Sequence, residues 1–297
     1  MKMQIYYNKN YIPFDLYINS IYNIFKTNDF FTVNNFEVSI INNICDYSKD
    51  TDFLILFLNY VKDIFYLDTN NTKIIFIHAD YIINHSNDDQ IAMYDYLNKK
   101  NKDNSYIWDY SILNLNYYNE HFSNKKIYFI PLLHNEYLED IYNKFKLNIP
   151  HNEKPIDVLF MGNNSRRREM LLDKISKKHN LYIMTNVNDI GDYISIIDKS
   201  KIIITFFSKE ENYSFDWYRL SFLYSNKIFA IHEYSPCHDY LEDVTIKTDY
   251  DNILNVIAEC LNKSENEIEL IKEKTYERYK KNDMSLSIID FFKPFLI

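Results

Sequence analysis

Hydrophobic residues occur along the chain in short runs of strand length, which alternate with longer segments of helical spacing. The runs span residues 3–7, 52–58, 73–78 and 126–131 in the first half, and 156–162, 181–185, 201–207, 227–232 and 244–247 in the second. Continuous apolar runs of this kind are typical of strands that are buried on both faces of a parallel sheet. Their alternation with helices predicts an α/β fold.

Helical spacing fills most of the segments between these runs. It covers residues 14–26, 88–99, 165–178, 190–199, 215–225 and 250–262, and two further helices are predicted at 264–281 and 284–294. Typical helices in globular proteins have such lengths, and none of the apolar stretches approaches the 18 or so residues that a membrane-spanning helix needs. We therefore expect no transmembrane segment.

A polar segment near the middle of the chain predicts a domain boundary. Residues 146–157, KLNIPHNEKPID, carry two of the six prolines and interrupt both the strand and the helix pattern. We expect an N-terminal domain over residues 1–150 and a C-terminal domain over 151–282, each Rossmann-like, with its own sheet and facing the other across a cleft. The apolar helix of residues 283–297 needs a partner, either on the first domain or within the second.

The amino-acid composition is unusual in a way that reflects codon usage. The chain has 28 Tyr and 21 Phe but only 2 Gly and 6 Pro. Tyr, Phe, Asn, Ile and Lys have AT-rich codons, so an AT-rich microbial or viral genome explains the bias. The runs of Asn are therefore not interpreted as a functional low-complexity segment.

Charge and cysteine content narrow the class of protein. The net charge is −9, with −5 in residues 1–150 and −4 in 151–297, so neither half has the basic surface that non-specific nucleic-acid binding needs. Cys45, Cys237 and Cys260 are far apart, which favours a reduced compartment and no zinc site. The N-terminal sequence has no secretory signal pattern. We expect a soluble cytoplasmic protein, in the host cytoplasm if the source is viral.

The segment that follows the strand at 156–162 is a candidate anion site. The strand ends at Gly162, one of two glycines, and a polar loop leads to Ser165 as the predicted N-cap of a helix. That helix begins with three of the chain's five arginines, Arg166, Arg167 and Arg168. A helix N-terminus and forked guanidinium donors suit phosphate oxygens, so a diphosphate is the expected ligand. The alternative is a run of arginines that faces solvent.

A second candidate segment spans residues 200–233. A buried strand leads through an acidic loop to a helix from about residue 215, where Asp216 and Arg219 lie three residues apart on one face. A carboxylate in this first turn could accept hydrogen bonds from ribose hydroxyl groups. It could equally complement the helix dipole and pair with Arg219 at the surface.

Together these segments resemble the C-terminal half of GT-B glycosyltransferases. The resemblance is strongest to the group similar to bacterial spore-maturation glycosyltransferases, which also has relatives in large DNA viruses. It covers about residues 155–262, and a looser similarity extends to residues 107–111 and 126–137. The matching residues are Asp157, Gly162, Arg166, Arg167, Ser200, Lys201, Asp216, Arg219 and Glu233.

The resemblance implies a nucleotide-sugar donor, UDP- or GDP-linked, bound mainly by the second domain. The diphosphate would lie over the Gly162 loop and the ribose near Asp216. The implied donor-binding residues are Gly162, Asn163, Asn164, Arg166, Arg167, Asp216, Arg219 and Glu233. A glycan, protein or lipid acceptor would enter from the first domain, and no metal ion or other cofactor would be needed because helix dipoles and basic side chains stabilise the departing nucleotide.

The sequence departs from the pattern of many retaining members of this fold, which carry two glutamates separated by seven residues. If Asp216 takes the second position, the first falls on Ser208, and Glu210 and Glu211 come two and three residues later. Retention and inversion therefore both stay open. An inverting enzyme needs a general base, for which His78 and Asp80 at the end of a strand are the candidates, with Asp109 and His134 as further ones.

Two other classes of function stay open. Metal-dependent GT-A transferases use an Asp-x-Asp motif after a strand. Asp249 and Asp251 fit that description, but they lie late in the chain, and N-capping of the helix that follows explains them better. The Asp-x-Asp at residues 50–52 precedes its strand. The missing acidic residue at Ser208 also allows a non-catalytic protein that binds a nucleotide or glycan without turning it over.

Overall fold

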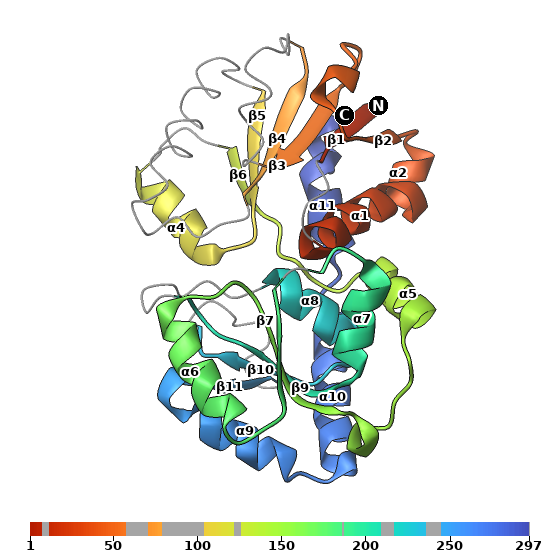
Figure 1. Ribbon diagram of the computed structural model, residues 1–297. Helices are drawn as coiled ribbons and strands as arrows, with labels where there is room; N and C mark the ends of the chain where they lie inside the picture. Colours follow the sequence, from red (N-terminus) through yellow and green to blue (C-terminus); the bar gives the residue numbers. More distant parts are fainter. Residues whose placement is uncertain are drawn as a thin grey trace. The chain divides into compact units, whose positions relative to one another are not determined.

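The computed structural model describes residues 1–7, 12–57, 71–78, 104–121, 126–185, 187–208, 217–235 and 245–296 (Figure 1). The chain divides into two compact units. The first consists of Met1–Asn10, Tyr17–Leu132 and Met284–Ile297, and the second of Tyr11–Leu16 and Leu133–Asp283. Each unit is built on its own parallel sheet.

In the described part of the first unit, six parallel strands form one sheet. Their spatial order is β2 (Glu37–Ile41), β1 (Lys2–Tyr6), β3 (Phe53–Phe57), β4 (Lys73–His78), β5 (Ser105–Asp109) and β6 (Lys126–Phe129). The central strand β3, with the sequence FLILF, is buried at every residue, which is the pattern of a parallel strand covered on both faces. The chain proceeds from β1 to β2 on one side and to β3 on the other, so the order reverses between β1 and β3.

The apolar runs at 3–7, 52–58, 73–78 and 126–131 correctly predict β1, β3, β4 and β6, but two strands of this sheet have no counterpart among them. The edge strand β2, EVSII, has exposed residues among its buried ones, and β5, SYIWD, begins and ends with polar residues. Neither gives a continuous apolar run, because an edge strand is paired on one side only and β5 carries its polar Asp109 into the interior. The helix predicted over residues 88–99 lies outside the described residues.

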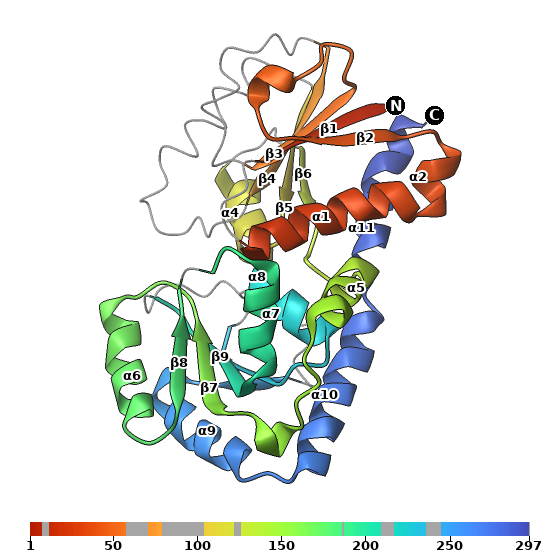
Figure 2. The same ribbon diagram turned by 45° about the vertical axis from the view of Figure 1, so that its right-hand side comes forward.

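In the described ranges, the helices of the first unit are α1 (Ile12–Thr27), of which residues 12–16 fall in the second unit, α2 (Asp29–Val33), α4 (Ile112–His121) and α11 (Met284–Phe292). α11 comes from the end of the chain and belongs to this unit (Figures 1 and 2). The ring of its Phe292, fully buried, lies edge-on to several aromatic rings from α1, α2, β3 and the loop before β2. The centroid distances are 5.4 Å to Phe25, 5.8 Å to Phe31, 5.5 Å to Phe36 and 5.0 Å to Phe53.

The described part of the second unit contains a sheet of five parallel strands. Their order is β11 (Ile246–Thr248), β10 (Ala230–Glu233), β9 (Ser200–Thr205), β7 (Ile156–Met161) and β8 (Leu181–Met184). The chain moves from β7 to β8 on one side and to β9 on the other, so the strand order reverses between β7 and β9. In open α/β sheets, ligands bind outside the carboxyl ends of the strands at such a reversal.

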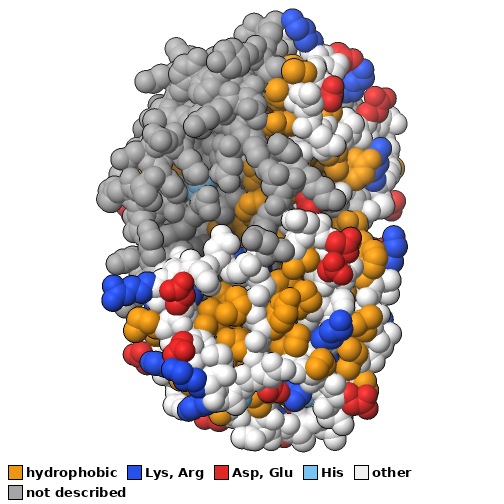
Figure 3. Space-filling view, in the orientation of Figure 1, with side chains coloured by type: hydrophobic (Ala, Val, Ile, Leu, Met, Phe, Trp, Pro, Cys, Tyr) orange, Lys and Arg blue, Asp and Glu red, His pale blue; other side chains and the backbone are white. Residues whose placement is uncertain are grey.

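Helices cover both faces of the second sheet (Figure 2). They are α5 (Glu136–Phe145), α6 (Arg166–Ser176), α7 (Ile190–Asp198), α8 (Trp217–Ser225), α9 (Ile253–Leu261) and α10 (Glu265–Lys280). α6 and α9 share one apolar core with the alternate residues Val158 and Phe160 of β7 and Ile202 and Ile204 of β9. Figure 3 shows Lys and Arg side chains over the outer face of α6.

The polar segment that precedes β7 is held in place by hydrogen bonds to a buried carboxylate on α7. Asp198, buried at the end of α7, accepts hydrogen bonds from the backbone N–H groups of Leu147 at 2.5 Å and Asn148 at 2.8 Å. The hydroxyl group of Tyr142 on α5 donates to the same carboxylate at 2.9 Å, and burial beside Asp198 raises the pKa of this hydroxyl well above its usual value. The polar segment is thus ordered by one buried carboxylate.

Two residues that match the resemblance, Asp157 and Lys201, lie at the amino-terminal ends of β7 and β9. The Lys201 ammonium group donates to the Asp157 carboxylate at 2.8 Å, and the backbone N–H of Asn180 donates to it at 3.0 Å. Partial burial opposes the charged carboxylate, but these two donors outweigh that effect and lower the pKa of Asp157. Because ligands gather at the opposite edge of the sheet, this pair stabilises the fold.

None of the helices in the described ranges is both long and apolar enough to cross a membrane.

We predict that Phe292→Ala destabilises the protein by about 3–5 kcal/mol, because it leaves a cavity among aromatic rings that cannot close up easily. Leu286→Ala on the same helix removes a side chain that is 58% exposed and should cost less than about 0.5 kcal/mol. Urea unfolding measures both variants. Equal destabilisation would show that α11 does not depend on this aromatic contact.

Asp157→Asn should reduce stability at pH 7 by less than about 1 kcal/mol, since the pair is partly exposed. The lowered pKa means that the native state favours the charged carboxylate. Its contribution is therefore present above the usual Asp value of 3.8 and is lost as the pH falls through the lower native value. As the pH falls from 7 to 2, the free energies of unfolding of the wild type and the variant should converge. A difference that persists at pH 2 would contradict a stabilising role for the charged Asp157 carboxylate.

Candidate functional site

The loop between β7 and α6 lies at the carboxyl edge of the second sheet, at the point where its strand order reverses. Gly162 follows β7 directly and is buried, with φ at +152°. A Cβ atom placed there would lie 3.2 Å from Phe160 Cζ, 3.3 Å from Arg168 Nη1 and 3.6 Å from Arg219 Nη2. Both the backbone angle and the close guanidinium groups explain why the chain places one of its two glycines here.

The helix after this loop begins as predicted. Ser165 is the N-cap of α6, and its hydroxyl group accepts a hydrogen bond from the backbone N–H of Arg168 at 3.3 Å. The side chains of Asn163 and Asn164 are exposed in the loop before it. The loop therefore presents amide side chains and the positive end of a helix at the same edge of the sheet.

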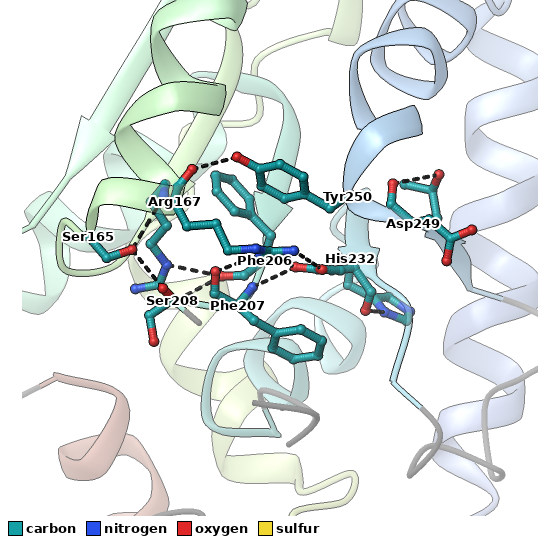
Figure 4. Close-up of polar contacts among 11 residues, drawn as sticks. Ser165, Arg167, Phe206, Phe207, Ser208, His232, Asp249 and Tyr250 are labelled. Carbon is teal, nitrogen blue, oxygen red and sulfur yellow. Dashed lines mark hydrogen bonds and ion pairs between the residues drawn. The ribbon is translucent and has the colours of Figure 1, made fainter. Parts of the chain in front are cut away.

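The three consecutive arginines have different surroundings. Arg166 is exposed. Arg167 donates through Nη1 to Glu233 Oε2 at 2.8 Å and through Nη2 to Glu233 Oε1, which makes a forked ion pair between α6 and the end of β10 (Figure 4). Its guanidinium group also lies 3.8 Å above the ring of Tyr250. The anion that Arg167 contacts in the structure is a carboxylate of the chain itself.

Arg167 and Arg168 also fix residues 206–208, which follow β9 across the reversal of strand order. Arg168 donates to the carbonyl oxygen of Phe206 through Nε at 3.1 Å and Nη2 at 2.8 Å, and Arg167 Nη1 donates to the carbonyl oxygen of Phe207 at 2.9 Å. The Ser165 hydroxyl group donates to the carbonyl oxygen of Ser208 at 3.0 Å. Four side-chain hydrogen bonds thus hold the backbone of one loop against the start of α6 (Figure 4).

Glu233 completes this arrangement. Its Oε2 accepts a hydrogen bond from the backbone N–H of Phe207 at 2.8 Å as well as from Arg167. The side chains of Arg167 and Glu233 are only 14% and 10% exposed, so the pair is largely withdrawn from water. Sequence reasoning grouped both residues at one ligand site and missed that they bind each other. Their opposite charges, at positions that follow or end strands of one sheet, are the sequence feature that could have predicted this ion pair.

Arg219 lies in the first turn of α8, half-buried, with Nη2 3.6 Å from the position that a Cβ atom on Gly162 would take. The structure therefore brings together Gly162 and Arg219, which the sequence assigned to the same donor site. Asp216, Glu210 and Glu211 lie outside the described residues. The neighbouring Trp217 is 2% exposed and packs in the core of the unit.

Asp249 occupies the N-cap position of the short helix Tyr250–Asn252, but its side chain makes no capping hydrogen bond. The N-capping expected for this carboxylate is therefore absent. In the described ranges, no group of three or more His, Cys, Asp or Glu side chains is arranged to hold a metal ion.

The predicted base His78 lies at the end of β4 in the first unit, where its side chain is 1% exposed. Its Nδ1 is 2.9 Å from Asp109 Oδ2, at the end of the neighbouring strand β5. Asn114 on α4, also fully buried, donates to both carboxylate oxygens of Asp109, at 3.2 and 3.1 Å. The predicted partner Asp80 lies outside the described residues. The sequence analysis did not identify Asn114, which no motif or spacing in the sequence marks.

His134, a further candidate base, lies in the second unit. Its Nε2 is 2.5 Å from Glu139 Oε1, and the hydroxyl group of Tyr276 donates to the same oxygen at 2.8 Å. Its backbone N–H also donates to the carbonyl oxygen of Asn282 at 3.2 Å. These contacts give His134 a role in joining α5 to the end of α10.

Comparisons with known proteins find similarity in fold. No protein-family model matches the sequence, and no curated protein matches it. A structure of trehalose-6-phosphate synthase, described as an enzyme of glycosyl transfer with retention, matches with a TM-score of 0.65 at 8% identity. The match covers 100% of this chain and 99% of that one.

Two further structures are similar along nearly their whole length. The spinosyn forosaminyltransferase SpnP matches with a TM-score of 0.50 at 8% identity, covering 100% of this chain and 99% of the other. The N-terminal domain of Candida albicans trehalose-6-phosphate phosphatase matches with a TM-score of 0.51 at 11% identity, covering 99% and 96%. The protein thus has the α/β fold of GT-B type, with two Rossmann-like units, as its sequence predicted.

Proposed function

We propose that this protein is a glycosyltransferase that moves a sugar from a nucleotide-sugar donor to an acceptor, and that its second unit holds the donor. The observation that carries this proposal is the position of Gly162 and Arg219 beside the start of α6, at the reversal of strand order in the second sheet. The fold shared with known glycosyltransferases supports it.

The chemistry of this edge suits a diphosphate. A glycine without a side chain lets phosphate oxygens approach the backbone, and the N–H groups of the first turn of α6 point toward the same space. Arg219 supplies a guanidinium group beside them. The fold holds the backbone N–H groups in place before the ligand arrives, so together with Arg219 they can stabilise the negative charge that develops as the nucleoside diphosphate leaves.

The contacts redistribute the roles of the predicted donor-binding residues. In this proposal Arg219, the Gly162 backbone and the side chains of Asn163 and Asn164 contact the diphosphate, while Asp216 binds the ribose. Arg167 and Glu233 act on the donor indirectly, because their side chains are engaged with each other and with the backbone of Phe207. Arg166, exposed at the start of α6, is a further diphosphate contact.

The identity of the donor and the acceptor rests on the sequence resemblance. The donor would be UDP- or GDP-linked, the acceptor a glycan, protein or lipid, and the reaction would need no metal ion because basic groups already balance the diphosphate charge. The similarity to spore-maturation glycosyltransferases rests on the sequence pattern alone. Chelation with EDTA separates this proposal from the metal-dependent alternative at Asp249 and Asp251.

A thermal-shift screen with UDP, GDP, CDP and their sugar conjugates tests the donor site. We expect one nucleoside diphosphate to raise the melting temperature by several degrees, with and without EDTA, because binding to the native state alone stabilises it. Arg219→Ala should lose most of this shift. Arg278→Ala is the matched control, since it removes an exposed arginine on α10 that the proposal gives no part in donor binding, and should keep the shift.

The outcomes of the screen separate the alternatives. A shift that disappears with EDTA would favour a metal-dependent site, and a shift without any release of nucleoside diphosphate from a nucleotide sugar would indicate a binding protein. No shift with any nucleotide, or the same shift in wild type and Arg219→Ala, would contradict the proposed donor site.

Arg167→Ala should behave differently, because it leaves the buried carboxylate of Glu233 without its ion-pair partner. We expect a loss of about 3–5 kcal/mol in the free energy of unfolding. The double variant Arg167→Ala/Glu233→Gln should regain part of that loss, since Gln carries no charge and can still accept from Phe207 N–H. Urea unfolding of the two single variants and the double variant gives the coupling. Strictly additive losses would show that the two residues do not stabilise each other.

A further inference from the structure

The Asp-x-Asp motif after β11 directs its central residue, and not its two acids, toward the start of α6. Asp249 and Asp251 are exposed, and Asp249 makes no capping hydrogen bond. Tyr250 between them is half-buried, and its hydroxyl group donates to the carbonyl oxygen of Arg167 at 2.6 Å. In Figure 4 the Tyr250 side chain points at Arg167, whereas the Asp249 carboxylate is turned away from it. The motif therefore contacts the candidate donor site through its aromatic residue.

The hydroxyl group of Tyr250 belongs to a continuous chain of hydrogen bonds. The carbonyl group of Arg167 and the N–H of Arg168 are parts of one peptide group, and this N–H donates to the hydroxyl group of Ser165 at 3.3 Å. The Ser165 hydroxyl group donates in turn to the carbonyl oxygen of Ser208 at 3.0 Å. Hydrogen bonds in such a chain polarise and strengthen one another. Tyr250 thus links the end of β11, through the N-cap of α6, to the loop that follows β9.

The ring of Tyr250 makes a second contact with the same arginine. The Arg167 guanidinium group lies 3.8 Å from the ring centroid, and its in-plane donors hold the Glu233 carboxylate. Because these donors lie in the plane of the group, the ring occupies a face that they cannot use. The attraction between a cation and an aromatic face is stronger where water is excluded, and the Arg167 side chain is only 14% exposed. The ring restrains the side chain while the hydroxyl group restrains the backbone.

We propose that Tyr250 is a positioning residue for the donor, which holds the first turn of α6 and the Arg167 side chain in the geometry that the diphosphate needs. The inference rests on the proposed function. The N–H groups of a helix N-terminus bind an anion best when the first turn keeps its direction, so a hydroxyl group that holds this turn lowers the ordering cost of binding. The motif contributes through its tyrosine, and its two carboxylates take no part in donor binding.

Isothermal titration calorimetry of the full chain with UDP, GDP and CDP tests this role, at a temperature at which every variant is folded. Tyr250→Phe keeps the ring and removes only the hydroxyl group. We expect it to raise the Kd of the nucleoside diphosphate that binds about 3–10-fold, the factor that one hydrogen bond supplies. Tyr250→Leu also removes the ring and should raise Kd about 10–50-fold. Partial recovery by the conservative Phe variant is a result that a general loss of stability would not give.

Tyr142→Phe is the matched control. It removes a tyrosine hydroxyl group that donates to Asp198 at 2.9 Å in the same unit, and the proposal gives that contact no part in donor binding. This variant should lower the melting temperature and leave Kd unchanged. The double variant Asp249→Asn/Asp251→Asn should also leave Kd unchanged, because Tyr250 remains in place.

A double-mutant cycle tests whether Tyr250 acts through the N-cap of α6. Ser165→Ala breaks the same chain of hydrogen bonds, so its effect on the free energy of nucleotide binding and that of Tyr250→Phe should be less than additive when the two are combined. Strictly additive effects would show that the two residues act separately, and they would overturn the inference.

The remaining outcomes separate this inference from the proposed function. A Kd that Tyr250→Phe leaves unchanged, or one that Tyr142→Phe raises equally, would show that Tyr250 contributes to stability only. A Kd raised by Asp249→Asn/Asp251→Asn would show that the acids of the motif bind the donor. Each of these results overturns the inference and leaves the donor site standing. Failure of the proposed function gives a different pattern, because the wild-type protein would then bind none of the three nucleotides.

Discussion

The forked ion pair between Arg167 and Glu233 is the contact on which the candidate donor site depends. It joins the start of α6, which follows β7, to the end of β10, and both partners also hold the backbone of Phe207 after β9. Three strand ends at the carboxyl edge of one sheet are thereby fixed relative to one another. Because the pair is largely withdrawn from water, removal of one partner leaves an uncompensated charge, and the loops lose their common anchor.

This constraint explains why neighbouring arginines serve different purposes. Arg167 and Arg168 bind groups of the protein itself. Arg167 pairs with the Glu233 carboxylate and Arg168 donates to the carbonyl oxygen of Phe206, and these contacts hold the loops in place. Arg219 comes from another helix and lies beside Gly162, where an added Cβ atom would be crowded. A diphosphate would then meet backbone N–H groups that the fold holds in place, together with the guanidinium groups of Arg219 and Arg166, with little rearrangement of the backbone needed at the moment of reaction.

Much of the fold could be predicted from the sequence, because buried parallel strands such as Phe53–Phe57 give continuous apolar runs and Ser165 is a strong N-cap. The edge strand Glu37–Ile41 could not, since its exposed residues break the run. The contacts within the candidate site could not be predicted, because they join residues that are far apart in the sequence. Arg167 and Glu233 are 66 residues apart, and His78 contacts Asp109 from the next strand in the sheet, so only the strand order reveals these partners. Asn114 has no sequence signal at all.

A crystal structure with the stabilising nucleoside diphosphate tests the location of the donor most directly. We expect the diphosphate against the backbone of residues 162–165, with a phosphate oxygen within hydrogen-bond distance of Arg219 and the Arg167–Glu233 pair unbroken. A diphosphate bound elsewhere, or one that displaces Glu233 to contact Arg167, would contradict the account.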